Sequence, residues 1–200
     1  MNNDQLKVIP INTKAKLVSI NHEPTLCVIK AQKLYEFDEN TYAKLAGCDF
    51  HNGTIEVQVL SQLLPDAPDF ARGFIGLAFR INEDDSAFES FYIRPTNGQT
   101  TDPVRKQHAV QYFSYPKCNF EYFRTHHITD FEGPANIALN QWIDLRAEIK
   151  DKTGKFYLND RLALKVDHLK HGASPRGAIG FFVDIGTKGF FKNLQITPAD

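Results

Sequence analysis

Thr54-Ile55-Glu56-Val57-Gln58-Val59 decides the fold, because its apolar and polar residues alternate strictly. Ile55, Val57 and Val59 fall on one side of an extended chain, while Glu56 and Gln58 fall on the other. A period of two is typical of a β-strand that has one face in a core and one in water. The stretch therefore predicts a strand in a half-buried sheet.

Further short stretches with alternating apolar and polar residues occur along the chain, and turn residues separate them. Hairpin turns are predicted at residues 82–85, 151–154 and 159–160. Single helical turns are expected at residues 42–45 and 168–171, and residues 95–102 read as a loop. Many short strands predict an all-β fold, a two-sheet antiparallel β-sandwich or jelly roll. The predicted strands are residues 17–20, 26–31, 73–81, 88–94, 109–115, 142–150, 155–158, 162–166, 178–184 and 190–196.

Length and composition favour one domain over residues 1–200. The 200 residues suffice for one sizeable core, and no repeat, linker or low-complexity tract divides them. Hydrophobic residues make up 42% and aromatic residues 12%, with 16 Phe, so we expect a core rich in phenylalanine.

The charge balance argues against a polyanionic partner. The chain has 23 basic and 24 acidic residues, a net charge of -1, so bulk charge predicts no nucleic acid and no anionic membrane surface as a partner. A local arginine cluster remains compatible with an acidic sugar.

No segment reads as a signal peptide or a membrane span. Residues 1–16 lack an apolar run followed by a small-residue cleavage site, and no stretch is long and apolar enough to cross a bilayer. A cytoplasmic protein and a mature secreted form both fit this pattern, and nothing in the sequence predicts an oligomeric state.

Six segments, read in chain order, carry a resemblance to a known superfamily. They are residues 50–57, 73–80, 89–97, 111–112, 142–146 and 180–194. Over residues 50–196 the chain resembles the concanavalin A-like lectin/glucanase superfamily, in its branch of bacterial LamG-like jelly-roll domains. The resemblance implies a jelly roll and, since the superfamily includes lectins, carbohydrate-binding modules, glucanases and polysaccharide lyases, it implies contact with sugar.

Two catalytic motifs of that superfamily are missing. Laminarinase-type members carry Glu-x-Asp-x-x-Glu on one strand, whereas Glu36-Phe37-Asp38-Glu39 and Glu83-Asp84-Asp85 begin similarly but fail the spacing. Jelly-roll alginate lyases carry Gln-Ile-His, and Gln107-His108 lacks the middle residue. Neither catalytic apparatus can be transferred to this chain.

Alternation along residues 73–81 divides this strand into a core side and a second side, which carries Phe74, Gly76, Ala78 and Arg80. In the superfamily the second side would face a concave surface. The small Gly76 and Ala78 beside Arg80 would either leave room for a ligand or let a loop pack over the sheet.

Residues 88–94 place Tyr92 and Arg94 on the same concave face, as expected neighbours of Arg80. A sugar site needs an aromatic ring for stacking and planar donors for hydroxyl or carboxylate groups, and these residue types supply both. The alternative is a structural lattice of cross-strand aromatic contacts and ion pairs. The acids available for that lattice are Glu56, Glu89 and Asp184.

Four more residues complete the candidate site and its rim. Gln111 is expected on the ligand face of the next strand, with Arg105 and His108 at its rim. His108 could act as a base or be an ordinary surface histidine. Asp184 is expected near the arginines as a ligand acceptor, a general base or, by default, a counter-ion. The predicted ligand-binding residues are thus Arg80, Tyr92, Arg94, Gln111 and Asp184.

Catalysis on the same face is an alternative, with Tyr92, His108, Glu89 and Asp184 as candidates. Hydrolysis needs two carboxylates on either side of one bond, and Glu89 with Asp184 is the nominated pair. A lyase would instead use a Tyr or His base with Arg and Gln to neutralise a uronate.

No metal site is predicted. His126-His127 and His168-x-x-His171 are the only metal-like spacings, and neither has an evident third ligand. The resemblance leaves a structural calcium as an option. Cys27, Cys48 and Cys118 form neither an even set nor a CxxC pair, so we expect free thiols.

The favoured hypothesis is a carbohydrate-recognising domain that binds a neutral or acidic saccharide on the concave face and needs no cofactor. A glycoside hydrolase or polysaccharide lyase on that face is the second hypothesis. A structural or protein-interaction sandwich is the third.

Overall fold

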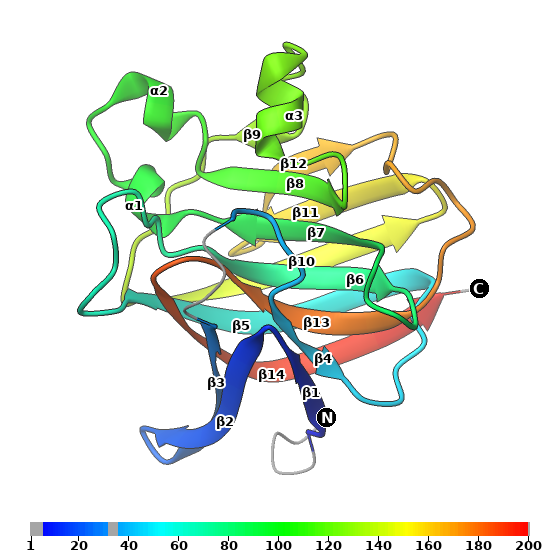
Figure 1. Cartoon of the computed structure of the whole chain (residues 1–200), viewed down its shortest axis with the longest axis horizontal. Coiled ribbons are helices and arrows are strands. Elements are labelled where there is room, and N and C mark those ends of the chain that lie inside the picture. The colour runs from blue at the N-terminus through cyan, green and yellow to red at the C-terminus, as the bar shows by residue number, and fades with distance from the viewer. Residues whose placement is uncertain (1–5, 32–35, 200) are drawn as a thin grey trace.

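A computed structural model describes residues 6–31 and 36–199. The first five residues of the segment tested for a signal peptide therefore lie outside the described residues. Within the described part, strands form two seven-stranded sheets in which every pairing is antiparallel, as predicted (Figure 1). We call them the β6 sheet, ordered β1-β4-β13-β6-β7-β8-β9, and the β5 sheet, ordered β12-β11-β10-β5-β14-β3-β2.

The strands of the β6 sheet are β1 (Val8–Ile11), β4 (Tyr42–Leu45), β6 (Ile75–Ile81), β7 (Phe88–Ile93), β8 (Val110–Tyr115), β9 (Glu132–Gly133) and β13 (Ala178–Val183). Those of the β5 sheet are β2 (Thr13–Ile20), β3 (Glu23–Lys30), β5 (Asn52–Leu63), β10 (Trp142–Lys150), β11 (Thr153–Leu158), β12 (Arg161–Val166) and β14 (Thr187–Ala199). The turn expected at residues 42–45 is therefore a strand, β4, between β1 and β13.

The structure confirms the predicted alternation of buried and partly exposed side chains in residues 54–59. Ile55 and Val57 are buried, whereas Glu56 between them is partly exposed. Across the antiparallel pair, Val57 lies opposite Leu145 of β10, so both strands turn their apolar side chains the same way. Burying a residue of this size contributes about 1.5–3 kcal/mol, which explains why the register is well specified.

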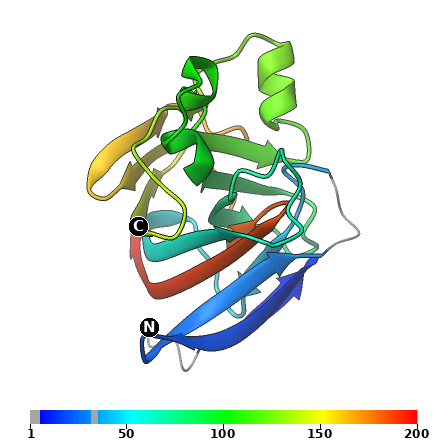
Figure 2. The same ribbon diagram turned by 90° about the vertical axis from the view of Figure 1, so that its left-hand side faces the viewer.

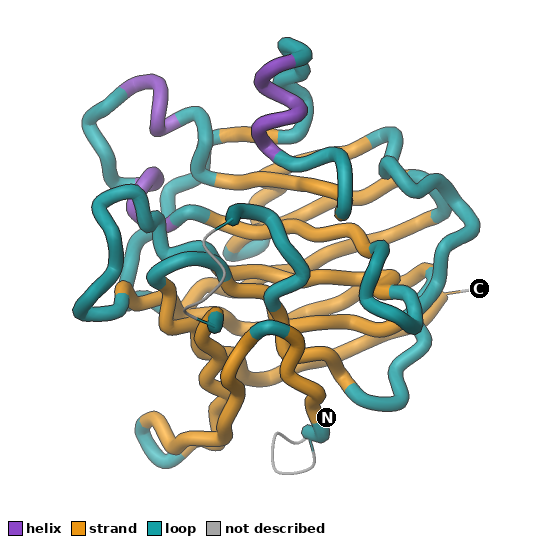
Figure 3. Tube along the Cα trace, in the orientation of Figure 1, coloured by secondary structure: helices purple, strands orange, loops and turns teal. Residues whose placement is uncertain are grey.

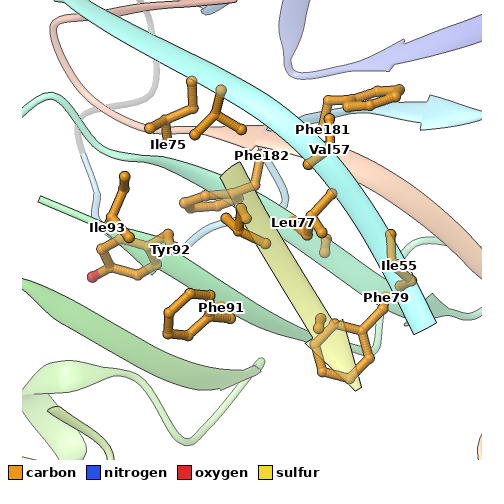
Figure 4. Packing of buried hydrophobic residues seen from close by; sticks show 14 of the residues in the cluster. Ile55, Val57, Ile75, Leu77, Phe79, Phe91, Tyr92, Ile93, Phe181 and Phe182 are labelled. Atoms are coloured by element: carbon orange, nitrogen blue, oxygen red, sulfur yellow. The ribbon is translucent and has the colours of Figure 1, made fainter. Parts of the chain in front are cut away.

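The core between the sheets is rich in phenylalanine, as expected. Leu77, Phe79 and Phe91 of the β6 sheet point toward Ile55 and Val57 of β5 (Figure 4). Phe91 also stacks on Phe156 of β11, with ring centroids 4.4 Å apart. Aromatic rings fill large volumes with few torsions to fix, so they close the space between two twisted sheets efficiently.

The outer face of the β6 sheet is covered, contrary to the prediction of an open concave face. All seven residues of β6 and all six of β7 are buried. Segment 36–41, which leads into β4, crosses in front of β6 and β7 (Figure 1), and its Phe37 packs edge-on against Phe74. Alternation within β6 and β7 could not reveal that segment 36–41, which precedes both strands in the chain, covers this face.

Gly76 leaves no space for a ligand, and segment 36–41 packs over this face of the sheet, as the second alternative for Gly76 and Ala78 expected. A Cβ at this position would lie 2.1 Å from the carbonyl oxygen of Phe91 and 2.5 Å from the Cα of Tyr92. The glycine is therefore needed because β6 and β7 approach closely where Gly76 and Tyr92 pair.

A bulge interrupts the alternation near the end of β6. Ile81 pairs with Ala178 and Ala78 pairs with Gly180, so two residues of β6 oppose Ile179 alone. Arg80 has a φ of 53° there, in the left-handed region. The bulge turns the Arg80 side chain away from the outer face.

Three short helices lie at one edge of the sandwich, next to β8 and β9 (Figure 2). They are α1 (Pro95–Gly98), α2 (Pro103–Lys106) and α3 (Phe120–Thr125), and the rest of the described chain is strand or loop (Figure 3). The loop expected at residues 95–102 thus contains a helix. Asp102 caps α2 through Val104 N and Arg105 N, and Asn119 caps α3 through Tyr122 N.

The described residues contain no helix that is long and apolar enough to cross a bilayer. The three cysteines are free thiols, as expected. No group of three or more His, Cys, Asp or Glu side chains that could hold a metal ion occurs among residues 6–31 and 36–199. A calcium site built partly from backbone oxygens stays a prediction.

Candidate ligand-binding site

A cavity of about 420 Å³ opens where β7 ends and β8 begins, beside the three helices. We call it the arginine pocket. Its lining combines four phenylalanines, four arginines and three further residues from separate loops and helices. These residues are Phe37, Phe70, Phe74, Phe120, Arg72, Arg94, Arg105, Arg124, Asn97, Val104 and His108.

Phenylalanines form one wall of the pocket. The Phe37 ring makes edge-to-face contacts with Phe70, Phe74 and Phe120, with centroids 5.5–5.6 Å apart. Phe70 remains 46% exposed, so part of this wall is open to a ligand. An exposed ring beside donors is the combination that sugar stacking requires.

Glu132 organises two of the arginines. Its Oε1 lies 2.7 Å from Arg94 Nη1 and 2.7 Å from Arg124 Nη2. Arg94 and Glu132 are nearly buried, whereas Arg124 is partly exposed. Burial opposes the charge of Arg94, but Tyr92, Glu132 and Asp38 outweigh it and raise its pKa. Arg94 is therefore a fixed cation in the pocket.

Arg72 and Arg105 have no such counter-ion in the part of the chain that the structure describes. Arg72 Nη1 donates to the carbonyl oxygens of Asp69 and Ala71, at 2.6 and 3.0 Å. Arg105 donates from Nε and Nη2 to Asn97 Oδ1, at 3.2 and 3.1 Å. Among the described residues neither guanidinium makes an ion pair. Burial, then repulsion from Arg105 and Arg94, lowers the pKa of Arg72, although Asp69 partly offsets it.

His108 lies at the rim, as predicted, and its role is set by Glu132. Its Nδ1 is 3.0 Å from Glu132 Oε2, and the side chain is 27% exposed. Burial lowers the pKa of His108, and Arg124 and Arg94 add to that effect against Glu132. A neutral imidazole at the rim can exchange hydrogen bonds with hydroxyl groups.

Tyr92 and Gln111 support Arg94 from behind. Arg94 Nη2 donates to Tyr92 Oη at 2.8 Å and to Gln111 Oε1 at 3.1 Å. Both supporting side chains are fully buried. The sequence thus correctly placed Arg94, Tyr92 and Gln111 together, while only Arg94 lines the cavity.

Asp184 lies deeper, as a fully buried counter-ion of Lys30. Its Oδ1 is 2.6 Å from Lys30 Nζ, and its Oδ2 accepts a hydrogen bond from Asp38 N at 3.0 Å. The predicted counter-ion role agrees with this contact, although the partner is a lysine of β3 and none of the expected arginines.

The expectation that Arg80 neighbours Tyr92 and Arg94 is wrong. Arg80 donates to the carbonyl oxygens of His51, Gly172 and Asp151 and to Asn52 Oδ1, at 2.8–3.0 Å. The bulge directs it to these loops, at the opposite end of β6 from the pocket. Arg80 binds the protein's own backbone.

The nominated carboxylate pair is also separated. Glu89 pairs with Phe79 across β6 and β7, so it faces the core between the sheets, where Tyr112 Oη donates to it at 2.8 Å. Asp184 faces the outer side at the other end of the strands. Glu89 and Asp184 therefore do not flank one bond in this arrangement.

Burial also affects the candidate base Tyr92. Desolvation, opposed by Arg94, raises its pKa well above the ordinary tyrosine value. A phenolate is thus disfavoured there, and the Tyr92 hydroxyl is engaged with Arg94. Of the four nominated catalytic candidates, His108 lines the arginine pocket, whereas Tyr92, Glu89 and Asp184 do not.

Comparison with known proteins adds to this geometry. No family model matches the sequence, and no curated protein matches it either. Among solved structures, the carbohydrate-binding module CBM66 from Bacillus subtilis matches with a TM-score of 0.56 and 14% identity, over 92% of this chain and 94% of that one. The chain has the concanavalin A-like jelly-roll fold.

Two further structures match nearly the whole chain. A putative glycosyl hydrolase from Parabacteroides distasonis gives a TM-score of 0.56 at 12% identity, over 96% of this chain and 100% of that one. A Bacillus subtilis protein of unknown function with a galectin-like fold gives 0.54 at 9% identity, over 98% and 91%. These similarities are similarities of fold.

Sequence reasoning missed much of the pocket. Arg72, Arg124, Phe120 and Glu132 belong to three separate segments, and each is an ordinary polar or aromatic residue in its own surroundings. The one available signal was Arg105 next to the loop at residues 95–102. Only the folded chain brings these segments to one place.

Proposed function

We propose that this protein is a carbohydrate-recognising domain that binds an acidic saccharide in the arginine pocket. One observation carries the proposal: Arg72 and Arg105, two guanidinium groups without a carboxylate partner among the described residues, face a cavity with an exposed phenylalanine ring. The fold similarity to a carbohydrate-binding module supports the choice of ligand class.

The chemistry of the pocket fits an acidic sugar. Guanidinium groups bind carboxylate or sulfate groups through two parallel hydrogen bonds, and such charge-assisted bonds are stronger than neutral ones. Phe70 offers a face for the apolar side of a sugar ring, while Asn97 and His108 offer partners for hydroxyl groups. The volume of about 420 Å³ lies within the usual range of about 300–1,000 Å³ for small-ligand sites.

Electrostatics favours an anion over a neutral ligand here. Four guanidinium groups line the pocket, and Glu132 is the carboxylate paired with two of them. A bound anion would relieve the repulsion that Arg72 experiences from Arg105 and Arg94. A neutral sugar would leave that repulsion in place.

Calorimetry with a panel of acidic and neutral oligosaccharides tests the proposal. We expect binding of acidic members that weakens with added salt, and a loss of roughly tenfold or more for Arg72→Gln and for Arg105→Gln, since each removes a charge-assisted hydrogen bond. Phe70→Ala should weaken binding through lost stacking.

Arg176→Gln is the matched control, because Arg176 is an exposed arginine paired with Asp49 outside the pocket. Binding by this variant should equal that of the wild type. Acidic saccharides that bind equally well to Arg72→Gln and Arg105→Gln, or a complete absence of binding by folded protein, would contradict the proposal. Reducing-end and unsaturated-uronate assays on the same panel report any cleavage.

A further inference from the structure

A buried charged cluster lies directly behind the arginine pocket. It contains two carboxylates, Asp38 and Asp184, with the cations Lys30 and Arg94 and the hydroxyl of Tyr92. Every member is less than 10% exposed. Two acids in one buried cluster repel each other when both are ionised, so the charge of Asp38 is sensitive to any charge added nearby.

The two carboxylates are unequally satisfied. Asp184 receives hydrogen bonds from Lys30 Nζ, Asp38 N and Ile185 N, at 2.6–3.0 Å. The Asp38 carboxylate receives a hydrogen bond from Phe120 N at 3.0 Å, and a side-chain hydrogen bond from Tyr92 also stabilises its ionised form. With fewer donors than Asp184, the buried Asp38 carboxylate is the less stabilised of the two in its ionised form.

The proton affinity of Asp38 follows from this position. Burial, and then the negative charge of Asp184, raise the pKa of Asp38 to about 7, although the Phe120 amide and Arg94 act in the opposite direction. The group therefore changes charge near neutral pH, where an ordinary aspartate is fully ionised.

Asp38 is joined to the pocket by three links. Its sequence neighbour Phe37 is part of the aromatic wall, and its hydrogen-bond donor Phe120 belongs to the same wall. The third link is Arg94, which lines the pocket and lowers the pKa of Asp38 through its charge. The backbone of Asp38 has a φ of 57°, so the segment is held in an unusual conformation by these contacts.

We propose that Asp38 takes up a proton when an anionic group occupies the arginine pocket, so that anion binding strengthens as the pH falls through neutrality. The anion in the pocket and the Asp38 carboxylate share the positive charge of Arg94, so occupation of the pocket makes the ionised form of Asp38 less favourable. By linkage, protonation of Asp38 in turn favours the anion. The inference rests on the proposed function only in taking the pocket as an anion site.

Glu132 and His108 also lie beside Arg94 and the pocket. Glu132 faces Arg94 from β9, and Arg124 holds its pKa below the ordinary value against the effect of burial. His108 has a lowered pKa, so it charges in a more acidic range than Asp38. Proton uptake measured between pH 7 and 8 therefore reports on Asp38 rather than on His108.

Sodium sulfate is the probe, because its charge is constant in this range. The carboxyl carbon of Asp38, assigned by its loss in Asp38→Asn, is titrated by NMR in sulfate and in sodium chloride of equal ionic strength. We expect a higher titration midpoint in sulfate, and no difference between the salts in the Arg72→Gln/Arg105→Gln variant. An equal midpoint in both salts for wild-type protein overturns the inference.

Saccharide binding supplies the second readout. For an acidic oligosaccharide that binds, calorimetry in buffers of different ionisation enthalpy should show proton uptake, and affinity should fall by up to tenfold per pH unit above about 7. Asp38→Asn should abolish both effects, while His108→Gln retains them. A sulfate effect without saccharide binding rejects the proposed function alone, whereas saccharide binding without proton uptake rejects the linkage alone.

Discussion

Arg94 and Glu132 form an ion pair at 2.7 Å in which the two side chains are only 5% and 6% exposed. The same Glu132 oxygen also binds Arg124, so one carboxylate pairs with two guanidinium groups and leaves a net positive charge beside the pocket. A buried pair of this kind adds little stability over an apolar pair, but removing one partner is costly because the other charge stays buried. This relationship fixes Arg94 in place and makes Glu132 a structural requirement of the pocket.

The first prediction concerns that carboxylate. Glu132→Ala should lower the free energy of unfolding by about 3–5 kcal/mol, since Arg94 loses its counter-ion in a buried position. Urea unfolding measures the change. Asp49→Ala removes an exposed pair with Arg176 and should cost less than about 1 kcal/mol. Similar losses in both variants would contradict the assignment.

Glu132 should also determine part of the acid stability. Burial favours the neutral carboxyl, but Arg124 and Arg94 outweigh it and lower the pKa of Glu132 below its ordinary value of 4.5. The stabilisation is therefore present above pH 4.5 and is lost as the pH falls through the lowered pKa. Thermal unfolding of the wild type should show this extra acid loss, and Glu132→Gln should not.

For the Asp38 carboxyl we predict a contribution to stability with the opposite pH dependence. Its pKa is raised from 3.8 to about 7, so its contribution is fully present below pH 3.8 and is lost as the pH rises through about 7. Each unit of pKa difference corresponds to about 1.4 kcal/mol. Asp38→Asn should therefore gain stability relative to the wild type at pH 8 but gain nothing at pH 4.

Comparing the two proteins is essential in this experiment, because burial also raises the pKa of Glu89 and gives the wild type a second loss of the same sign. Melting temperatures of wild type and Asp38→Asn across pH 4–8 provide the measurement. Parallel curves would show that Asp38 is not the titrating group.

The close approach of β6 and β7 gives a fourth prediction. Gly76→Ala should cost about 1–3 kcal/mol or more, because the new methyl group meets the backbone of Phe91 and Tyr92. Gly133→Ala is the control, since a Cβ there has only ordinary contacts at 3.5 Å. Denaturant unfolding should separate the two variants clearly, and equal stability would mean that the strands can move apart.

Arg80 is predicted to act in folding and not in ligand binding. Arg80→Lys keeps the charge but cannot reach all four acceptors, and buried acceptors left unsatisfied cost about 1–3 kcal/mol each. We expect a stability loss of at least about 2 kcal/mol with unchanged saccharide affinity. A loss of saccharide affinity without a loss of stability would contradict this prediction and indicate that Arg80 binds the ligand.

Local pattern was sufficient for the architecture. Alternation from Ile55 to Val59 placed β5 and its inner face correctly, because a half-buried strand leaves a period-two record in its own residues. Alternation does not predict the surroundings of β6, because both faces of this strand are buried by other parts of the chain. Alternation also mispredicts Arg80, because a β-bulge turns this side chain to the other face of the sheet, and the sequence around Arg80 does not signal the bulge.

The sequence by itself determined a two-sheet antiparallel sandwich and the association of Tyr92, Arg94 and Gln111, because strand periodicity is a local property and β7 and β8 are consecutive strands that pair. Only the tertiary structure decided that segment 36–41 covers the expected open face, and that the arginine cavity lies at the end of the strands. Phe37, Arg72, Arg105 and Phe120 meet there because long-range packing of loops and short helices brings them together. No sequence periodicity predicts this pocket, because each loop or helix contributes only a few residues to it.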